Sequence, residues 1–200
     1  MSESNPIVVL AYPRTGSSMI SQIFEAHGVF VGKDADPNQL MPTGNSENLN
    51  LKKILIDMCG TGIHLAKQFK PGFRKRILDA IYAEGYDGGD WLAKHAAVYW
   101  PIWDEFEPRF VNIRRNREST IKSNTISGMS GRRGQALYDA LQMNLEQMEM
   151  VHKLYDAPYV DSDEVINGEY RTLEKAFSRY DMKFDPTIPP EVVDKRYWHY

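Results

Sequence analysis

Apolar and polar positions alternate along this chain with two different periods. Short apolar runs rich in β-branched residues are typical of buried strands. Five such runs occur, at 7–12, about 28–32, 91–95, 109–114 and 158–162. Apolar residues at helical spacing lie between them, over 73–83, 137–154 and 169–180. Because strands that alternate with helices favour a parallel sheet covered on both faces, we expect an α/β fold of three layers with about five central strands.

Length and charge limit the possible functions. Two hundred residues favour a single domain over 1–200 that is long enough to bury a core. The 24 basic and 27 acidic residues leave a formal charge of −3, so we expect neither nucleic acid nor an anionic membrane as a partner. The single cysteine, Cys59, excludes an internal disulfide. An apolar run at Ile7 leaves no room for a signal peptide, and no run approaches the roughly 20 residues of a membrane span, so we expect a cytoplasmic protein.

A candidate anion-binding loop follows the first apolar run directly. The segment 11–18 reads Ala-Tyr-Pro-Arg-Thr-Gly-Ser-Ser, and an apolar-periodic segment comes next. A strand, a tight loop and a helix in this order direct backbone N–H groups at a phosphate. The nucleoside-triphosphate loop G-x-x-x-x-G-K-[ST] would require Gly at Ala11 and Lys at Ser17. Arg14 supplies the cation instead, which predicts a P-loop-like fold whose ligand is not an ordinary triphosphate with magnesium.

A second cationic motif follows the predicted strand at 109–114. Arg115 comes directly after this run, and Asn116 is suited to cap a helix that continues through Ser123. Ser123 then lies about two helical turns into that helix. Ligands of parallel sheets bind at the carboxyl ends of the strands, so both motifs are expected at the same edge of the sheet.

Together the two motifs resemble those of sulfotransferases that use 3′-phosphoadenosine 5′-phosphosulfate (PAPS). The 5′-phosphosulfate loop of that family reads roughly Y-P-[KR]-[ST]-G-[ST]-[ST], which residues 12–18 fit at every position. Its 3′-phosphate motif is an Arg and a Ser eight residues apart, as are Arg115 and Ser123. Arg117 replaces the usual Pro, which is favoured but dispensable at a helix start. By this resemblance the chain is identified as a small, soluble, bacterial- or phage-type member that binds PAPS through Arg14, Thr15, Gly16, Ser17, Ser18, Arg115 and Ser123.

Three weaker segments resemble the same family. Residues 158–164, the helix after them and Phe184-Asp185-Pro186 are similar to its late strand, helix and "FDP" ending. Residues 91–95 are similar to its strand with a Lys near a His or Asp. Residues 44–47, Gly-Asn-Ser-Glu, are similar to the Gly-x-x-Glu that precedes a helix in bacterial members.

The resemblance implies a reaction and candidate catalytic residues. A sulfuryl group would pass from PAPS, the co-substrate, to a hydroxyl or amine of a small-molecule or glycan acceptor. Arg14 would stabilise the charge that grows on the leaving phosphate, and Lys94 would contact the sulfate. The base is His95, which follows a strand, or Glu47, which the bacterial and carbohydrate-directed branches favour, or another group, including one of the substrate itself. No His, Cys, Asp or Glu cluster has the spacing of metal ligands, so no metal is expected.

Several alternatives remain open from the residues alone. A small-molecule or nucleotide kinase would share the fold but should keep the loop Lys, and a non-catalytic nucleotide-binding relative would share it too. The aromatic residues after His95 either line an acceptor pocket or pack in the core: Tyr99, Trp100 and Trp103. Four further arginines either contact the donor or lie in solvent: Arg114, Arg117, Arg132 and Arg133. The loops at 32–50 and 128–134 are either lids or plain connectors.

Overall fold

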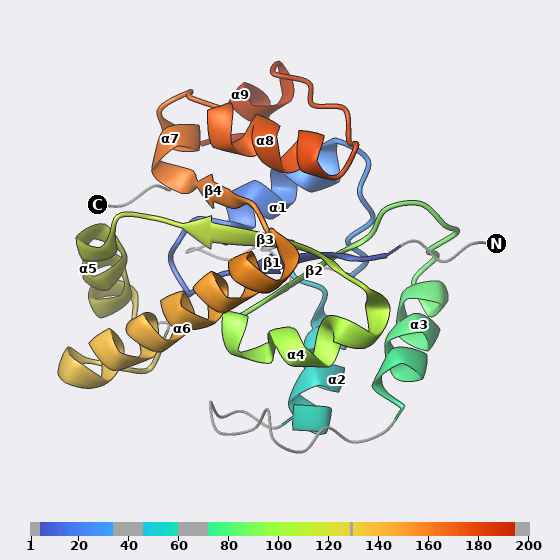
Figure 1. Ribbon diagram of the computed structural model, residues 1–200, viewed down its shortest axis with the longest axis horizontal. Coiled ribbons are helices and arrows are strands. Elements are labelled where there is room, and N and C mark those ends of the chain that lie inside the picture. Colours follow the sequence, from blue (N-terminus) through green and yellow to red (C-terminus); the bar gives the residue numbers. More distant parts are fainter. Residues whose placement is uncertain (1–4, 34–45, 60–71, 129, 195–200) are drawn as a thin grey trace.

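A parallel β-sheet forms the centre of the molecule. The computed structural model describes residues 5–33, 46–59, 72–128 and 130–194. In this part of the chain the strands are β1 (Ile7–Leu10), β2 (Leu92–His95), β3 (Arg109–Arg114) and β4 (Tyr159–Asp161). They lie in the order β2-β1-β3-β4 and every neighbouring pair is parallel (Figure 1). The sheet of four strands confirms the α/β class, but the expectation of about five strands is wrong.

The segment at 28–32 accounts for the difference. It pairs with the sheet only through an isolated parallel bridge between Phe30 and Trp91. Gly28 and Gly32 flank it with φ of 88° and 80°, so the chain leaves the extended conformation at both ends. Val29 and Val31 are still buried, and Phe30 is partly buried. The segment is extended only briefly, so a ladder of strand length has no room to form.

Helices cover both faces of the sheet. They are α1 (Ser17–Ala26), α2 (Leu49–Cys59), α3 (Phe73–Ala83), α4 (Trp100–Trp103), α5 (Arg117–Ser127), α6 (Gly134–Tyr155), α7 (Ser162–Ile166), α8 (Arg171–Arg179) and α9 (Ile188–Val192), with short 3-10 turns η1 (Ala97–Tyr99) and η2 (Asp104–Phe106). Figure 1 shows α1, α8 and α9 on one face and α2, α3, α4 and α6 on the other. The helix expected at 73–83 has these bounds, whereas α6 extends past 137–154 at both ends.

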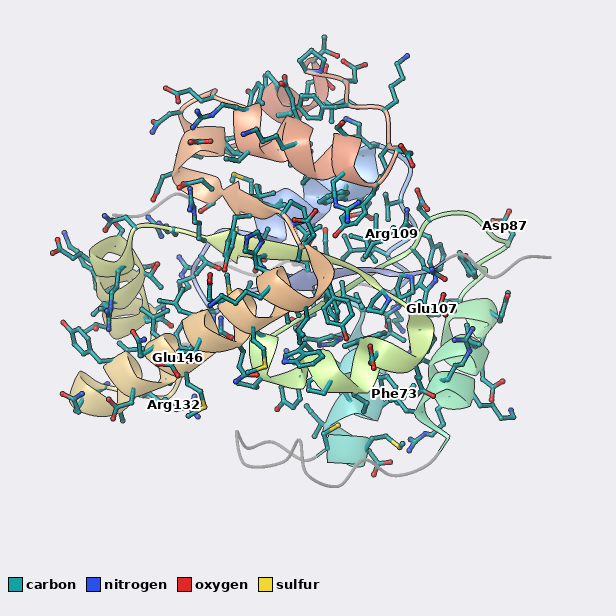
Figure 2. The ribbon with its side chains drawn as sticks, in the orientation of Figure 1. Phe73, Asp87, Glu107, Arg109, Arg132 and Glu146 are labelled. Carbon is teal, nitrogen blue, oxygen red and sulfur yellow. The ribbon has the colours of Figure 1, made fainter. Side chains whose placement is uncertain are left out.

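Each face of β1 supports its own hydrophobic core. Val8 and Leu10 pack with residues of α2, α3, α4 and α6, whereas Ile7 and Val9 pack with residues of α1 and α8. Successive side chains of a strand point to opposite faces, so four buried residues in a row serve both layers. Phe73 of α3, labelled in Figure 2, meets the ring of Trp103 edge-on at 5.2 Å. The core therefore fixes the helices against both sides of the sheet.

Strand register brings the carboxyl ends of three strands to the same edge of the sheet. Leu10 of β1 pairs with His95 of β2 on one side and with Asn112 of β3 on the other. Figure 1 shows α5 beyond this carboxyl edge of the sheet. The amino edge is closed by Arg109, labelled in Figure 2, which pairs with Asp90 at 2.6 Å. The loop after β1, the end of β2 and the turn after β3 therefore lie at one edge, where the sequence predicted the site.

Candidate functional site

The loop between β1 and α1 has the tight turn that the sequence predicted. Arg14 and Gly16 adopt positive φ angles of 69° and 85°, and Gly16 is the residue that precedes the first turn of α1. The backbone N–H and the hydroxyl of Thr15 both donate to the carbonyl of Tyr12, at 3.3 and 2.7 Å. A turn of this kind ends with the N-terminus of a ten-residue helix, which attracts anions.

The second motif also has its predicted local structure. Arg115 follows β3 directly, and its side chain is only 3 % exposed. The side chain of Asn116 accepts a hydrogen bond from the N–H of Ser119 at 3.0 Å and so caps α5. Ser123 is buried on this helix. The cap and the helix explain how an arginine and a serine eight positions apart come to face the same region.

The two motifs are in direct contact. The Nε atom of Arg14 donates to the hydroxyl of Ser123 at 2.9 Å, across 109 positions of sequence. The Nη1 atom of Arg115 donates to the carbonyl of Arg14 at 3.2 Å. Asn124, next to Ser123, donates through Nδ2 to the carbonyl of Pro13 at 2.7 Å. The fold therefore joins the loop after β1 and the segment after β3 into a single polar site.

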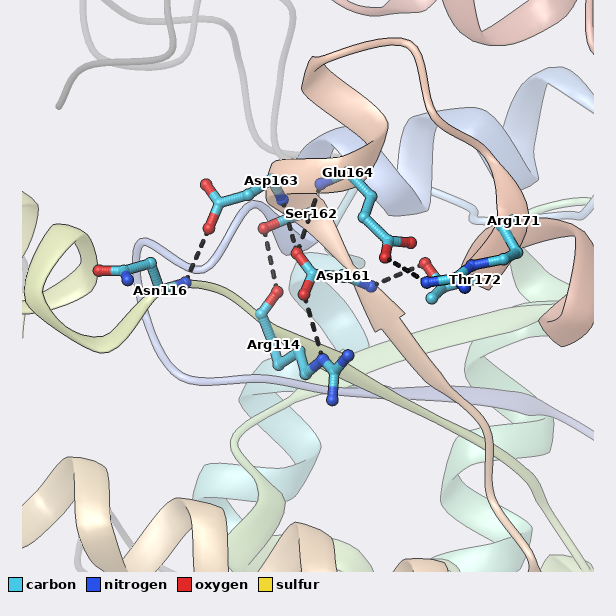
Figure 3. Close-up of polar contacts among 8 residues, drawn as sticks. All are labelled: Arg114, Asn116, Asp161, Ser162, Asp163, Glu164, Arg171 and Thr172. Atoms are coloured by element: carbon cyan, nitrogen blue, oxygen red, sulfur yellow. Dashed lines mark hydrogen bonds and ion pairs between the residues drawn. The ribbon is translucent and has the colours of Figure 1, made fainter.

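Arg115 has an acidic neighbour that sequence reasoning missed. Asp163 lies 3.4 Å from the Nε atom of Arg115 and accepts a hydrogen bond from the N–H of Asn116 at 2.7 Å. Figure 3 shows Asp163 beside Asn116, next to the network in which Asp161 pairs with Arg114. Burial lowers the pKa of Arg115, and the carboxylate of Asp163 acts against this. The signal in the sequence was an Asp-x-Asp at the end of a predicted strand, at the edge where ligands bind.

Lys94 lies at the helix end of the loop. It is the penultimate residue of β2, is only 8 % exposed, and its Nζ atom donates to the hydroxyl of Ser18 at 3.0 Å. Strand alternation sends the next side chain, His95, to the other face of the sheet. The loop is thus linked to α5 through Arg14 and to β2 through Lys94.

His95 is buried, and its imidazole is uncharged at neutral pH. Its ring stacks on Trp103 at 5.4 Å, and among the described residues no partner hydrogen bonds to Nε2. The pKa of His95 is lowered to about 4, mainly by burial; the charge of Glu47 opposes this shift, and the charges of Lys52 and Lys94 add to it. Glu47 itself pairs with Lys52 at 3.1 Å. Both candidates for the base therefore belong to one electrostatic neighbourhood.

The remaining sequence candidates have less definite places. Trp103 is fully buried, and Tyr99 and Trp100 pack against the same core, so these aromatic residues serve packing. Arg114 and Arg117 are exposed, and the guanidinium of Arg117 lies over the ring of Tyr138. Of the expected loops, residues 34–45 and 129, including Gly44 and Asn45, lie outside the described residues.

The described part of the chain offers neither a cluster of metal ligands nor a membrane-spanning helix. Residues 5–33, 46–59, 72–128 and 130–194 contain no group of three His, Cys, Asp or Glu side chains placed to hold a metal ion. Within the same ranges, every helix is too short or too polar to cross a lipid bilayer. The polar atoms gathered at the carboxyl edge are cationic groups, hydroxyls and amides together with two carboxylates, a set that suits an anion held by hydrogen bonds.

Comparison with known proteins identifies a related fold. The chain is similar to a solved structure, the sulfotransferase domain from the curacin biosynthetic pathway, with a TM-score of 0.59 and 11% sequence identity. The likeness covers 94% of this chain and 77% of that domain. A scan against models of known families finds no match, and neither does a comparison with curated protein sequences. At this identity the likeness concerns the fold, which is that of a sulfotransferase-like α/β domain.

Proposed function

We propose that this protein is a PAPS-dependent sulfotransferase that transfers a sulfuryl group to a hydroxyl or amine of a small-molecule or glycan acceptor. The observation that carries the proposal is the contact between the two motifs, in which Arg14 bonds to Ser123 and Arg115 bonds to the carbonyl of Arg14. PAPS has one phosphate at the 3′ position of its ribose and another, which carries the sulfate, at the 5′ position. A loop for one phosphate and an arginine–serine pair for the other, joined in one site, match that ligand.

The charges at the site support an anionic donor. Arg14, Lys94 and Arg115 all lie at the carboxyl edge, and two of them are nearly excluded from water. Burial lowers the pKa of Arg14 and of Arg115, because a charged guanidinium loses hydration there. Phosphate oxygens would restore the lost interactions through charge-assisted hydrogen bonds. Asp163 already offsets part of the loss at Arg115, which it contacts through Nε.

In the proposed reaction, one bond to sulfur forms as another breaks. The acceptor oxygen or nitrogen attacks sulfur and loses a proton to a base, while the bond between sulfur and the bridging phosphate oxygen breaks. The electron pair of that bond stays on the phosphate, and 3′,5′-adenosine bisphosphate leaves. Positioning and charge stabilisation dominate such a transfer. Arg14 and Lys94 are the cations that we assign to the growing negative charge, because Arg14 belongs to the loop that would hold this phosphate and Lys94 bonds to Ser18 at the end of that loop.

For the base, the geometry favours Glu47 over His95. At neutral pH an imidazole with a pKa of about 4 is a weak proton acceptor. Its ring is 7 % exposed and stacked on Trp103, so an acceptor hydroxyl has little access to it. The carboxylate of Glu47 is 20% exposed and held by Lys52. We therefore assign proton removal to Glu47 and give His95 a packing role beneath the site.

Ligand titration tests the donor assignment. Calorimetry should show that 3′,5′-adenosine bisphosphate binds about tenfold or more tightly than ADP, and that ATP with magnesium gives no advantage. Arg115→Ala should remove most of this preference, because the lost contact belongs to the 3′-phosphate. Arg114→Ala is the matched control, since this neighbouring arginine is exposed and bonds to Asp161 instead. Equal affinities for the bisphosphate and ADP in the parent protein would overturn the donor assignment.

Transfer itself needs a second measurement. Incubation with PAPS carrying labelled sulfur should yield a labelled product with a mixture of phenol, alcohol, amine and sugar acceptors. Bisphosphate binding without transfer to any of these acceptor types would instead support a non-catalytic nucleotide-binding protein. Tight binding of ATP with magnesium, and phosphoryl transfer from it, would support a kinase.

A further inference from the structure

Three successive carbonyl groups of the anion loop are each held by a hydrogen-bond donor. The carbonyl of Tyr12 accepts from Thr15, that of Pro13 from Asn124, and that of Arg14 from Arg115. A loop binds an anion by turning N–H groups toward it, so its carbonyl oxygens must point elsewhere. Thr15, Asn124 and Arg115 donate the hydrogen bonds that these carbonyl oxygens then need.

Asn124 differs from the other two donors in having no assigned part in ligand binding. It lies on α5 and is fully buried. Its Nδ2 atom donates both to the carbonyl of Pro13, at 2.7 Å, and to the carbonyl of Thr120 in its own helix, at 3.0 Å. The amide therefore ties the second residue of the loop turn to the helix that also carries Ser123.

The loop needs such a tie because of its backbone. Arg14 adopts a φ of 69°, a left-handed conformation that is unfavourable for residues other than glycine. Conformations of this kind persist where the surrounding contacts over-determine them. Asn124 fixes the carbonyl that directly precedes Arg14, so it restrains the peptide whose rotation would release the left-handed residue.

We propose that Asn124 is a positioning residue that holds the loop at 12–18 in its anion-binding conformation, an inference that rests on the proposed function. Asn124 acts on the loop and not on the ligand. Its loss should therefore weaken every ligand that uses the loop, whether or not the ligand has a 3′-phosphate. The preference for the bisphosphate over ADP should stay unchanged, whereas Arg115→Ala should reduce it.

The principal variant is Asn124→Leu, which keeps much of the volume and removes the donor. Asn112→Leu is the matched control, because Asn112 is also fully buried, donates through Nδ2 to a backbone carbonyl, that of Met148, and has no hydrogen-bond partner on Oδ1 among the described residues. The Oδ1 atom of Asn124 likewise has no hydrogen-bond partner among the described residues. The two substitutions therefore remove the same kind of interaction, in one case at the loop and in the other beneath α6.

Two measurements separate this inference from the proposed function. Amide hydrogen exchange by NMR should show residues 14–18 exchanging about tenfold or more faster in Asn124→Leu than in Asn112→Leu. Calorimetry should show the bisphosphate and ADP weakened by the same factor, about tenfold, in Asn124→Leu alone. Faster loop exchange in a protein that does not bind the bisphosphate would support the role of Asn124 and overturn the proposed function. Unchanged exchange and affinity in Asn124→Leu would overturn the role of Asn124 and leave the proposed function standing.

A second variant covers the case in which Asn124→Leu does not fold. Asn124→Asp has nearly the same shape, but its carboxylate cannot donate to the carbonyl of Pro13. The protonated acid can, and burial raises the pKa of such a group. Loop protection and ligand affinity should therefore recover, relative to the parent protein, as the pH falls. If both variants unfold while Asn112→Leu stays folded, Asn124 has a general structural role and the proposal is wrong.

Discussion

The buried imidazole of His95 predicts a specific loss of stability in acid. Burial lowers the pKa of His95 to about 4 in the folded protein, and an unfolded chain restores a value of about 6.5. Between these two values the unfolded state binds a proton that the folded state does not. The free energy of unfolding therefore decreases as the pH falls from about 6.5 to about 4.

The size of the effect follows from the two pKa values. Each tenfold change in a proton dissociation constant corresponds to about 1.4 kcal/mol, so the complete effect is about 3 kcal/mol. Between about pH 7.5 and about pH 4.5 the imidazole should account for roughly 2.5 kcal/mol of it. That is a large share of the typical stability of a domain, about 5–15 kcal/mol.

His95→Phe isolates this contribution. The substitution keeps an aromatic ring against Trp103 and removes the titratable group. Urea unfolding at a series of pH values should show that the free energy of unfolding declines less steeply in acid for His95→Phe than for the parent. The difference in this free energy between the two proteins should change by roughly 2.5 kcal/mol between about pH 7.5 and about pH 4.5. Any packing cost of the larger ring is the same at every pH and cancels in the slope. Parallel curves for the two proteins would refute the burial argument and restore His95 as an accessible base.

The other predictions concern turnover and the start of α5. Arg14→Ala should lower turnover by ~10²–10³ with a smaller loss of bisphosphate affinity, because the charge it meets develops as the bond breaks; a loss confined to affinity contradicts the leaving-group role. Glu47→Gln should abolish most turnover while His95→Phe retains a substantial part, and the reverse order makes His95 the base. Asn116→Ala should cost about 1 kcal/mol in urea unfolding and Asn116→Gly only a few tenths, because the cap on the N–H of Ser119 is lost; equal losses would point to a different cause.

Local signals predicted the elements that carry the site. The helix at 73–83 and the strand at 109–114 have the expected bounds, since each has a clear apolar period. Asn116 caps α5 as expected, because capping depends on residues within one turn. The strand expected at about 28–32 was wrong because of its own ends: Val29 and Val31 are buried, but Gly28 and Gly32 adopt positive φ angles, and the segment forms only an isolated bridge.

The contacts of the site were less accessible to sequence reasoning. Parallel order predicted that Arg14 and Arg115 would share one edge, and it could not predict that Arg115 would hold the carbonyl of Arg14. Asp163 and Asn124 were missed because a carboxylate after a strand and an amide on a polar helix are common surface features. Their roles depend on distances across 48 and 111 positions of sequence, respectively. Such distances depend on how strands and helices pack, which the periodicity of one segment does not encode.

The electrostatic character of the site illustrates the same limit. A formal charge of −3 gives no sign of an anion-binding protein. Three cations nevertheless meet at the carboxyl edge because they follow or end three neighbouring strands: Arg14 after β1, Lys94 in β2 and Arg115 after β3. Lys94 is 8 % exposed and the side chain of Arg115 3 %, so neither keeps the hydration that stabilises a cation at the protein surface. Burying like charges together costs free energy, and Asp163 offsets part of that cost at Arg115. The strand order therefore makes this edge far more cationic than the formal charge of the chain indicates, as the proposed donor requires.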